Sequence, residues 1–339
     1  MSTFSKTNFK TVNYNSFRPQ YPPSFYNILG RYVQKGVFQH QLPVERAIDL
    51  GCGTGVATYP LLNLAKRVIG LDLSPKMIET ANSLVGKRLA ELGVNETGAE
   101  TGAGSDDKTD SVSNALPVVF KVGAVEDFIN KQESGITEES VDLITAAECI
   151  HWFKDYKSFF QSSAQLLKKG GTLAYFFYVD PMIVNFTGCS RTDFSKKDIL
   201  EKALHIYKKF AYEDLNYIGP YWEQPGRSIL QNFCVDANAK IPRDLYEDIE
   251  IHTFKTSFDN SRANEKSDLD LARLNISLSD YIDYFETYSG FHSYVEHTGN
   301  ADLLSKQFLN ELLEATGWDL NETKIDLVWN TGYTFLRKK

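Results

Sequence analysis

The segment Ala47-Ile48-Asp49-Leu50-Gly51-Cys52-Gly53-Thr54-Gly55 narrows the possible folds of this chain more than any other. It begins with a short apolar run, and glycine then occupies every second position after Asp49. Because glycine has no Cβ, such a segment lets a ligand approach the main chain closely. A glycine-rich turn between a strand and a helix is typical of nucleotide-binding α/β proteins. We therefore predict a ligand-binding turn that opens a helix after Gly55.

The apolar runs along the chain predict a mostly parallel sheet covered on both faces. These runs are short and apolar on both faces, and segments with helical spacing separate them. They cover residues 47–50, 67–73, 117–122, 141–147 and 172–179. Alternating strands and helices of this kind are typical of an α/β fold.

One helix is defined by its first residues. Ser74 is a favourable N-cap and Pro75 suits the first helical position, so we expect a helix from Pro75 that ends near Gly93. Pro60 should delay or kink the helix expected after Gly55. Further along, the pattern predicts mainly helices over 181–240, a strand over 250–258 and a helix over 277–294. The last element, 324–336, is expected to be a strand pair or one strand broken near Gly332.

The 339 residues are expected to form a single domain with three parts. Residues 1–40 are an aromatic, proline-punctuated arm, residues 41–180 a cofactor-binding core, and residues 181–339 cap helices followed by the last strands. Within the core, residues 95–115 hold five acidic side chains and Val112 as the only large aliphatic one. Such a segment cannot bury enough surface to offset its ordering, so we expect a mobile insertion.

The acids beside the glycine turn indicate which ligand it binds. A dinucleotide fingerprint would place Gly or Ala at position 56, which is Val56. Asp49 would repel a pyrophosphate but suits a cationic ligand such as S-adenosylmethionine, which carries an ammonium and a sulfonium. Asp72, 21 residues after Gly51, is placed to accept hydrogen bonds from the ribose hydroxyls. Since NAD enzymes share that acid, an NAD-dependent oxidoreductase stays open as the less favoured alternative.

The D-x-G-x-G-x-G run of 49–55 resembles the cofactor motif of class I methyltransferases. Longer motifs at 148–153, 219–227 and 328–331, with the arm at 14–22 and the helix at 278–294, resemble the fungal trans-aconitate methyltransferases. The resemblance covers the chain except 95–115. It implies a Rossmann-like fold with a seven-stranded, mostly parallel sheet whose last strand is antiparallel, and a helical cap. Related fungal methyltransferases that act on cantharidin share the sheet motifs but look different around 219–227.

The expected site lies beyond the carboxyl ends of the strands. The residues predicted to contact S-adenosylmethionine are Tyr14, Arg18, Asp49, Gly51, Cys52, Gly53, Gly55, Asp72, Leu73, Met77, Gly123, Ala124, Val125 and Ala147. Those predicted to contact the substrate are His151, Trp152, Tyr178, Tyr221, Trp222, Arg227 and His292. Arg227 is the first choice for a carboxylate because its planar guanidinium can bind one through two donors. Pairing with Glu223 or capping of a helix is the open alternative.

The implied reaction is methyl transfer from S-adenosylmethionine to a carboxylate of a small organic acid, with trans-aconitate favoured. Another small acid, or a xenobiotic of the cantharidin type, is the alternative substrate; a non-catalytic S-adenosylmethionine-binding protein is the alternative function. A carboxylate is already ionised near neutral pH, so no general base is expected.

Charge and composition exclude other partners. The net charge is −8, which argues against a nucleic-acid or anionic-membrane surface. The four cysteines lie far apart without metal-ligand spacing, so no metal and no disulfide are expected. No run approaches the length of a spanning helix and the first residues lack a signal-peptide pattern, so we expect a cytoplasmic protein. The oligomeric state is left open.

Overall fold

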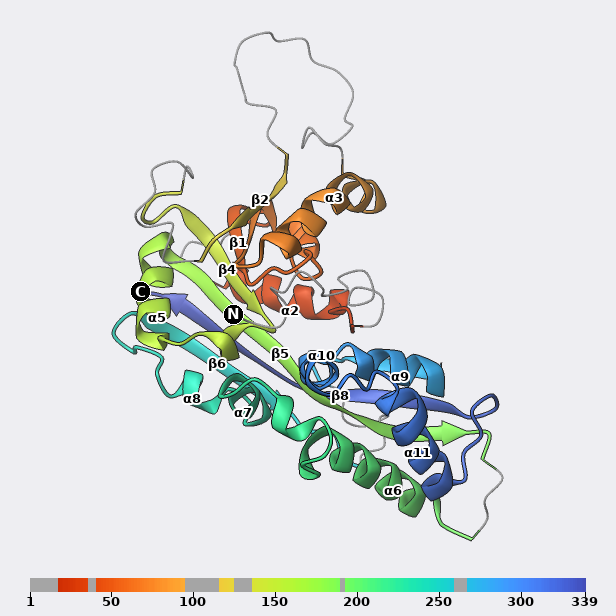
Figure 1. Ribbon diagram of the computed structural model, residues 1–339. Helices are drawn as coiled ribbons and strands as arrows, with labels where there is room; N and C mark the ends of the chain where they lie inside the picture. The colour runs from red at the N-terminus through yellow and green to blue at the C-terminus, as the bar shows by residue number, and fades with distance from the viewer. Residues whose placement is uncertain (1–17, 36–40, 95–115, 125–135, 190–192, 259–266) are drawn as a thin grey trace. The chain divides into compact units, whose positions relative to one another are not determined.

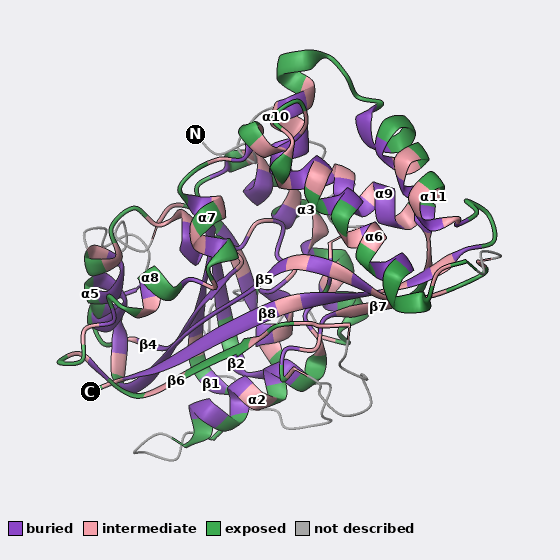
Figure 2. Ribbon diagram, turned by 90° about the horizontal axis from the view of Figure 1, so that it is seen from below, coloured by how far each residue is buried: buried purple, intermediate pink, exposed green. Residues whose placement is uncertain are grey.

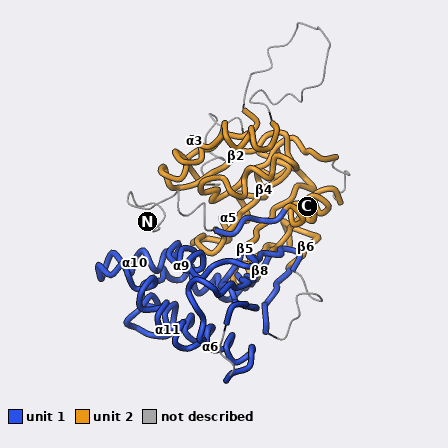
Figure 3. The backbone as a smooth tube through the Cα atoms, turned by 90° about the vertical axis from the view of Figure 1, so that its right-hand side faces the viewer, with its two compact units in different colours: residues 1–22, 177–235, 252–332 blue, residues 23–176, 236–251, 333–339 orange. Residues whose placement is uncertain are grey.

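The chain packs as two compact units in a computed structural model that describes residues 18–35, 41–94, 116–124, 136–189, 193–258 and 267–339. Unit 1 comprises residues 1–22, 177–235 and 252–332, and unit 2 comprises 23–176, 236–251 and 333–339 (Figure 3). Each unit is therefore assembled from separate stretches of the chain. The expectation of a single domain stays a prediction, and the insertion 95–115 lies outside the described residues.

The described strands form one sheet in the order β3-β2-β1-β4-β5-β8-β6, with β7 paired to β8 (Figure 1). Their bounds are β1 Val44–Leu50, β2 Ala65–Asp72, β3 Val118–Val122, β4 Val141–Ala147, β5 Leu167–Thr187, β6 Tyr246–Phe254, β7 Ala272–Ser277 and β8 Lys324–Lys338. The pairings of β1 with β2 and β4, of β2 with β3, and of β4 with β5 are parallel, which confirms the predicted α/β class.

The described sheet has eight strands where seven were expected. The added strand is β7, which pairs antiparallel with β8. None of its six residues is fully buried, and its sequence ARLNIS lacks the two-sided apolar character that marks the central strands. A search for apolar runs therefore does not find it.

The helices and helical turns of unit 2 are α2 Pro23–Gln34, η2 Tyr59–Asn63, α3 Pro75–Glu91, η4 Ile150–Trp152 and α5 Tyr156–Leu166. Ser74 caps α3 by accepting a hydrogen bond from the amide of Met77 at 3.3 Å, and Pro75 is the first helical residue, as predicted. The helix expected to open after Gly55 is delayed, as predicted from Pro60, and the residues that follow the glycine turn do not form an α-helix. Turns and the short 3-10 segment η2 follow instead, since Pro60 lacks the amide and the steric freedom that an α-helix needs there.

The core of unit 2 contains β4, in which every residue is buried (Figure 2). Phe25 of α2 lies with its ring centroid 4.9 Å from that of Phe176 and 5.4 Å from that of Tyr333. Arg337 of β8 is 1% exposed and donates to the carbonyls of Tyr32 and Gly170 at 2.8 and 3.1 Å. The end of the chain is thus part of this core.

Unit 1 contains most of the remaining helical segments. They are α6 Lys196–Lys208, η5 Lys209–Glu213, η6 Gly219–Tyr221, α7 Gly226–Gln231, α9 Leu278–Glu286, α10 Ser289–Thr298, η7 Leu303–Phe308 and α11 Leu309–Thr316; α8 Val235–Asn238 crosses the unit boundary. Within the unit, α6 contacts α11 and η5, and α10 contacts α9 and η6. None of the described helices is long and apolar enough to cross a bilayer.

Three expectations for the second half of the chain are corrected. Residues 181–187 continue β5 and are not helical. The helix expected over 277–294 is two helices, because Tyr288 is extended with ψ 135° and Thr287 bonds back to the carbonyl of Tyr284 at 2.6 Å. The segment 324–336 is a single strand that passes through Gly332, where a Cβ would lie 2.5 Å from the ring of Phe177. That glycine makes room for an aromatic ring and does not form a turn.

Candidate cofactor and substrate sites

The glycine turn after β1 has left-handed backbone at each of its three glycines. The φ angles of Gly51, Gly53 and Gly55 are +61°, +55° and +92°, a region that other residues rarely adopt. A Cβ on Gly51 would lie 2.6 Å from Cys149, and one on Gly55 would lie 2.7 Å from Tyr59. A Cβ on Gly53 would meet no described atom within 4 Å. Gly51 and Gly55 are thus packed against protein, whereas Gly53 faces open space that a ligand can enter.

Asp72 lies at the end of β2, where its carboxylate meets this turn. One oxygen accepts a hydrogen bond from the amide of Gly53 at 3.0 Å, and the other accepts from the amide of Ser74 at 2.8 Å. Burial raises the pKa of Asp72, and the two backbone hydrogen bonds lower it again in part. An ionised carboxylate offers about four acceptor sites, so Asp72 can accept two further hydroxyl donors, as a ribose would supply.

Two large apolar side chains lie open to solvent beside Asp72. Leu73 is 72% exposed, and Val122, the register partner of Asp72 on β3, is 54% exposed. The amide of Gly123 donates to the carbonyl of Asp72 at 3.0 Å, which joins the ends of β2 and β3. Exposed apolar groups next to a carboxylate suit a flat base attached to a ribose. Leu73 and Gly123 were predicted; Val122 was predicted only as part of a strand.

Asp49 lies beneath the turn and is fully buried. Its two oxygens accept hydrogen bonds from the hydroxyls of Thr58 and Thr145, both at 2.6 Å. Burial raises the pKa of Asp49 to about 6; the two hydroxyls lower it, and the charge of Asp72 raises it. The first role of Asp49 is therefore to hold the turn against β4.

The other residues predicted to contact the cofactor are buried or half-buried, or lie outside the described residues. Cys52, Met77 and Ala147 are 6%, 4% and 9% exposed, so their contact with the cofactor stays a prediction. Ala124 is half-buried. Tyr14 and Val125 are not among the described residues. Nowhere in the described chain do three His, Cys, Asp or Glu side chains lie together as a metal would require.

The end of β4 carries a backbone conformation that the sequence did not reveal. Glu148 has a φ of +53°, unusual for a residue with a Cβ, and its amide donates to the carbonyl of Phe176 at 2.8 Å. Strained residues of this kind cluster at binding and active sites. The next turn, η4, holds His151, which is 4% exposed and lies with its ring 4.8 Å from that of Trp152.

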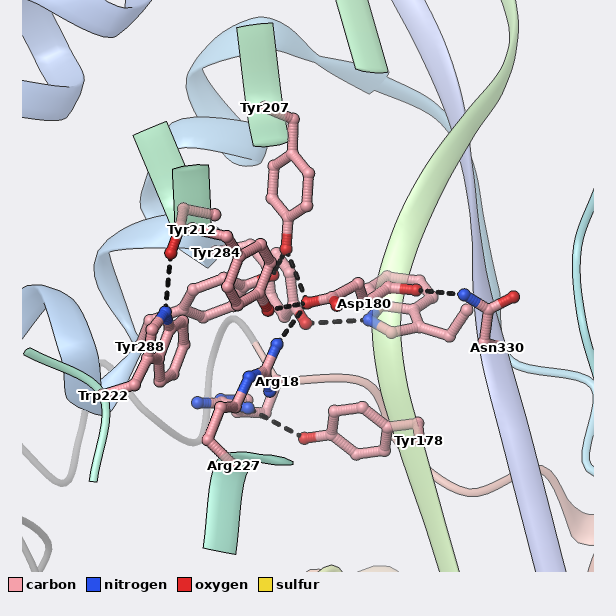
Figure 4. Close-up of polar contacts among 12 residues, drawn as sticks. Arg18, Tyr178, Asp180, Tyr207, Tyr212, Trp222, Arg227, Tyr284, Tyr288 and Asn330 are labelled. Atoms are coloured by element: carbon pink, nitrogen blue, oxygen red, sulfur yellow. Dashed lines mark hydrogen bonds and ion pairs between the residues drawn. The ribbon is translucent and has the colours of Figure 1, made fainter. Parts of the chain in front are cut away.

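Unit 1 contains a buried cluster of polar and aromatic side chains centred on Asp180 of β5 (Figure 4). Its Oδ1 accepts hydrogen bonds from the hydroxyls of Tyr207, at 2.7 Å, and Tyr212, and it pairs with Nη2 of Arg227. The guanidinium of Arg227 lies 4.2 Å from the ring centroid of Trp222. The Nε of Arg227 is buried and has no hydrogen-bond partner among the described residues. Arg227 therefore pairs with Asp180 and not with Glu223, and it retains a donor that a ligand could use.

Arg18 lies in the same cluster, as Figure 4 shows. It donates to the hydroxyl of Tyr178 at 3.2 Å and to the carbonyl of Thr287 at 3.0 Å. Its guanidinium lies 5.8 and 5.7 Å from the ring centroids of Tyr284 and Tyr288. The structure thus brings together four predicted residues, which are Arg18, Tyr178, Trp222 and Arg227.

Two predicted substrate residues have other surroundings. The ring of Tyr221 lies 5.4 Å from that of Tyr294 and 5.3 Å from that of His297. His292 is half-buried on α10, with its ring 6.4 Å from that of Phe291. Sequence reasoning missed Asp180, although a charged residue directly after an apolar strand was a usable signal.

Comparison with known proteins identifies the fold and the chemistry of unit 2. A family model described as a methyltransferase domain matches residues 48–175. A Saccharomyces cerevisiae protein named "Probable S-adenosylmethionine-dependent methyltransferase CRG1" is 27% identical over 342 residues, which cover 100% of this chain and 99% of that protein. A Dictyostelium discoideum protein named "Putative methyltransferase" is 25% identical over 327 residues, which cover 96% of this chain and 92% of that protein.

A solved structure supports the same fold. It belongs to an Anaeromyxobacter dehalogenans protein described as "a Putative Type II Methyltransferase", with a TM-score of 0.55 and 18% identity over 95% of this chain and 98% of that one. The open glycine turn, the carboxylate of Asp72 and the apolar surface beside it fit the cofactor of such enzymes. The chain has the class I methyltransferase fold, and it is an S-adenosylmethionine-dependent methyltransferase.

Proposed function

We propose that the enzyme transfers the methyl group to a carboxylate oxygen of a small organic acid, with trans-aconitate as the first candidate. The observation that carries this proposal is Arg227, a buried guanidinium in an aromatic cluster whose Nε has no hydrogen-bond partner among the described residues. Leaving a buried donor unsatisfied is unfavourable, and a substrate carboxylate would satisfy it. The motif 219–227 that suggested this substrate includes both Trp222 and Arg227.

In the cofactor site we propose the following roles. Gly53 allows close approach of the ligand to the turn, and Asp72 accepts the ribose hydroxyls. Leu73 and Val122 cover one face of the adenine. Asp49, through Thr58 and Thr145, keeps the turn in shape. The remaining residues predicted to contact the cofactor keep that predicted role.

The charges of the site suit transfer to an ionised oxygen. When bound, S-adenosylmethionine supplies an electrophilic methyl group on a positive sulfur. The acid is already ionised near pH 7, so no side chain has to remove a proton before attack. Arg227 would hold a carboxylate, while burial raises the pKa of Tyr207 and Tyr284 and keeps their hydroxyls neutral donors. Charge diminishes as the methyl group moves, so the aromatic walls, which exclude water, favour the reaction.

Mass spectrometry of products tests this proposal directly. The enzyme is incubated with methyl-deuterated S-adenosylmethionine and a panel of acids, each paired with its primary amide, and with a compound of the cantharidin type. We expect a methyl ester on an acid, trans-aconitate first, that mild alkali hydrolyses to labelled methanol. Label that resists alkali, as an ether or a methylated amine would, or no label on any acid, would refute carboxylate methylation.

A further inference from the structure

Asp180 connects several elements of unit 1 through few atoms. Its Oδ1 takes donors from α6, η5 and α7, which are Tyr207, Tyr212 and Arg227. Its main-chain carbonyl accepts from Nδ2 of Asn330 on β8 at 3.2 Å. Asn330 in turn accepts from the amide of Thr256 at 2.7 Å. Both the backbone and the side chain of Asp180 are therefore held in place.

This arrangement fixes the orientation of Arg227. The Nη2 atom is bound to Asp180, and the guanidinium lies 4.2 Å from the ring centroid of Trp222 and 5.2 Å from that of Tyr212. A guanidinium is planar, so fixing one nitrogen and the stacked ring also fixes the direction of the remaining N–H groups. The Nε–H, which lacks a partner among the described residues, is the donor whose direction is determined in this way.

Asp180 also changes the charge of the cluster. Its carboxylate compensates the positive charge of Arg227, whose side chain is only 11% exposed to solvent. A buried cation with a compensating anion attracts a further anion less strongly than the same cation alone. Asp180 therefore weakens the attraction for an acid and at the same time aims the donor that binds it.

We propose that Asp180 is the positioning residue of the acid-binding site: it aims Nε of Arg227 at the substrate carboxylate and limits how strongly the site attracts anions. This inference rests on the proposed function, because it assigns a role within the same site. It predicts that the carboxylate of Asp180 has two separable effects, one on the orientation of Arg227 and one on the charge of the site, and that two substitutions can distinguish them.

Asp180→Asn removes the charge and keeps the size of the side chain. We expect the KM for the acid to fall several-fold, because Arg227 is no longer compensated, and kcat to fall about tenfold or more, because its aim is lost. Asp180→Glu keeps the charge but moves it by one methylene. For this variant we expect kcat to fall while KM stays within about twofold of wild type.

Glu311→Gln is the matched control, since it removes the charge of a carboxylate that pairs with Lys209 elsewhere in unit 1 and keeps the size of the side chain. We expect it to leave both constants within about threefold of wild type. A thermal melt of each variant establishes that it is folded. The inference is overturned if Asp180→Asn raises KM, or if kcat and KM change in Asp180→Asn only as they do in Glu311→Gln.

A binding measurement separates this inference from the proposed function. Calorimetric titration of the acid into the complex with S-adenosylhomocysteine requires no turnover. Tighter binding by Asp180→Asn than by wild type supports the role of Asp180, and equal or weaker binding overturns it. Failure of wild type to form a methyl ester refutes the proposed function alone, since the binding comparison still decides the role of Asp180.

Discussion

The carboxylate of Asp72 accepts the amide of Gly53 at 3.0 Å, so the acid that ends β2 is tied to the glycine turn that follows β1. The two strongest cofactor signals in the sequence, 19 residues apart, are therefore one structural unit. Binding of a nucleoside to Asp72 would act directly on the backbone of the turn.

Asp72→Ala should weaken S-adenosylmethionine binding. Loss of a charged acceptor for the ribose hydroxyls corresponds to about 1.5–3 kcal/mol. Calorimetric titration measures this loss. Asp155→Ala is the matched control, because Asp155 also accepts two backbone amides, those of Lys157 and Ser158, at the start of α5. Asp155→Ala should lose about 1 kcal/mol of stability and keep its affinity for S-adenosylmethionine. Equal affinities in wild type, Asp72→Ala and Asp155→Ala would contradict the assignment of Asp72 to the ribose.

Gly53→Ala should abolish or strongly weaken cofactor binding without unfolding the protein. Its Cβ would enter the open space beside the turn, at a φ of +55°. Gly93→Ala is a matched control, since Gly93 has a φ of +67° and equally open surroundings. Both substitutions should cost about 1–2 kcal/mol of stability because of the left-handed backbone. Melting temperatures and titrations check this, and the idea fails if both variants bind the cofactor equally well.

The local signals of the sequence were sufficient for much of unit 2. Ser74 and Pro75 predicted the start of α3, and the two-sided apolar runs predicted β1 to β4, because each depends on neighbouring residues. The end of β5 was not predicted. Asp180-Pro181 resembles a strand terminus, yet β5 continues to Thr187. The strand can include Asp180 because the hydroxyls of Tyr207 and Tyr212, which lie 27 and 32 positions later, donate hydrogen bonds to its carboxylate.

The cluster around Asp180 shows the same limit of local sequence signals. Trp222 and Arg227 were found because they belong to a recognisable motif, but the partner of Arg227 was sought nearby at Glu223. The actual partner, Asp180, is 47 positions away. Contacts over such distances depend on the packing of α6, η5 and α7 against β5, which no periodicity in the sequence encodes.

Asp49 should make the stability of the protein depend on pH in an unusual direction. Its pKa of about 6 in the folded protein exceeds the ordinary value of 3.8, so the folded state holds this proton more tightly than the unfolded chain. The contribution of Asp49 is therefore largest below about pH 4 and declines as the pH rises to about 6, by about 3 kcal/mol in total. Urea unfolding between pH 4 and 7.5 checks this prediction: the free energy of unfolding of Asp49→Asn, minus that of wild type, should increase as the pH rises. A difference that stays constant with pH would refute the prediction.

Arg227→Lys should impair acid binding and leave cofactor binding intact. Lysine keeps the charge but loses the planar fork and the stacking on Trp222. We expect the KM for the acid to rise about tenfold, which corresponds to about 1.4 kcal/mol. Lys209→Arg is a useful control, because Lys209 pairs with Glu311 elsewhere in unit 1. If KM and kcat for the acid are unchanged in Arg227→Lys, Arg227 does not bind the substrate.

His151 should not act as a catalytic base. With a carboxylate as the nucleophile, kcat should stay nearly flat from about pH 6.5 to about 8.5, well above the pKa of the acid. His151→Asn should lower the rate through its packing with Trp152 while keeping this flat profile. A kcat that rises with an apparent pKa of about 7 in wild type, and not in His151→Asn, would instead identify a base and a substrate that attacks through a hydroxyl or an amine.

The chain crosses between its two units five times, at the junctions after residues 22, 176, 235, 251 and 332. Neither unit is a continuous segment of the gene, so no single exchanged stretch of sequence carries the cluster around Asp180 together with the whole of its unit. Even the last seven codons, for residues 333–339, belong to the cofactor unit and supply Arg337 to its interior. Under the proposed function, substitutions around Asp180 and Arg227 would change substrate specificity within a scaffold inherited as a whole.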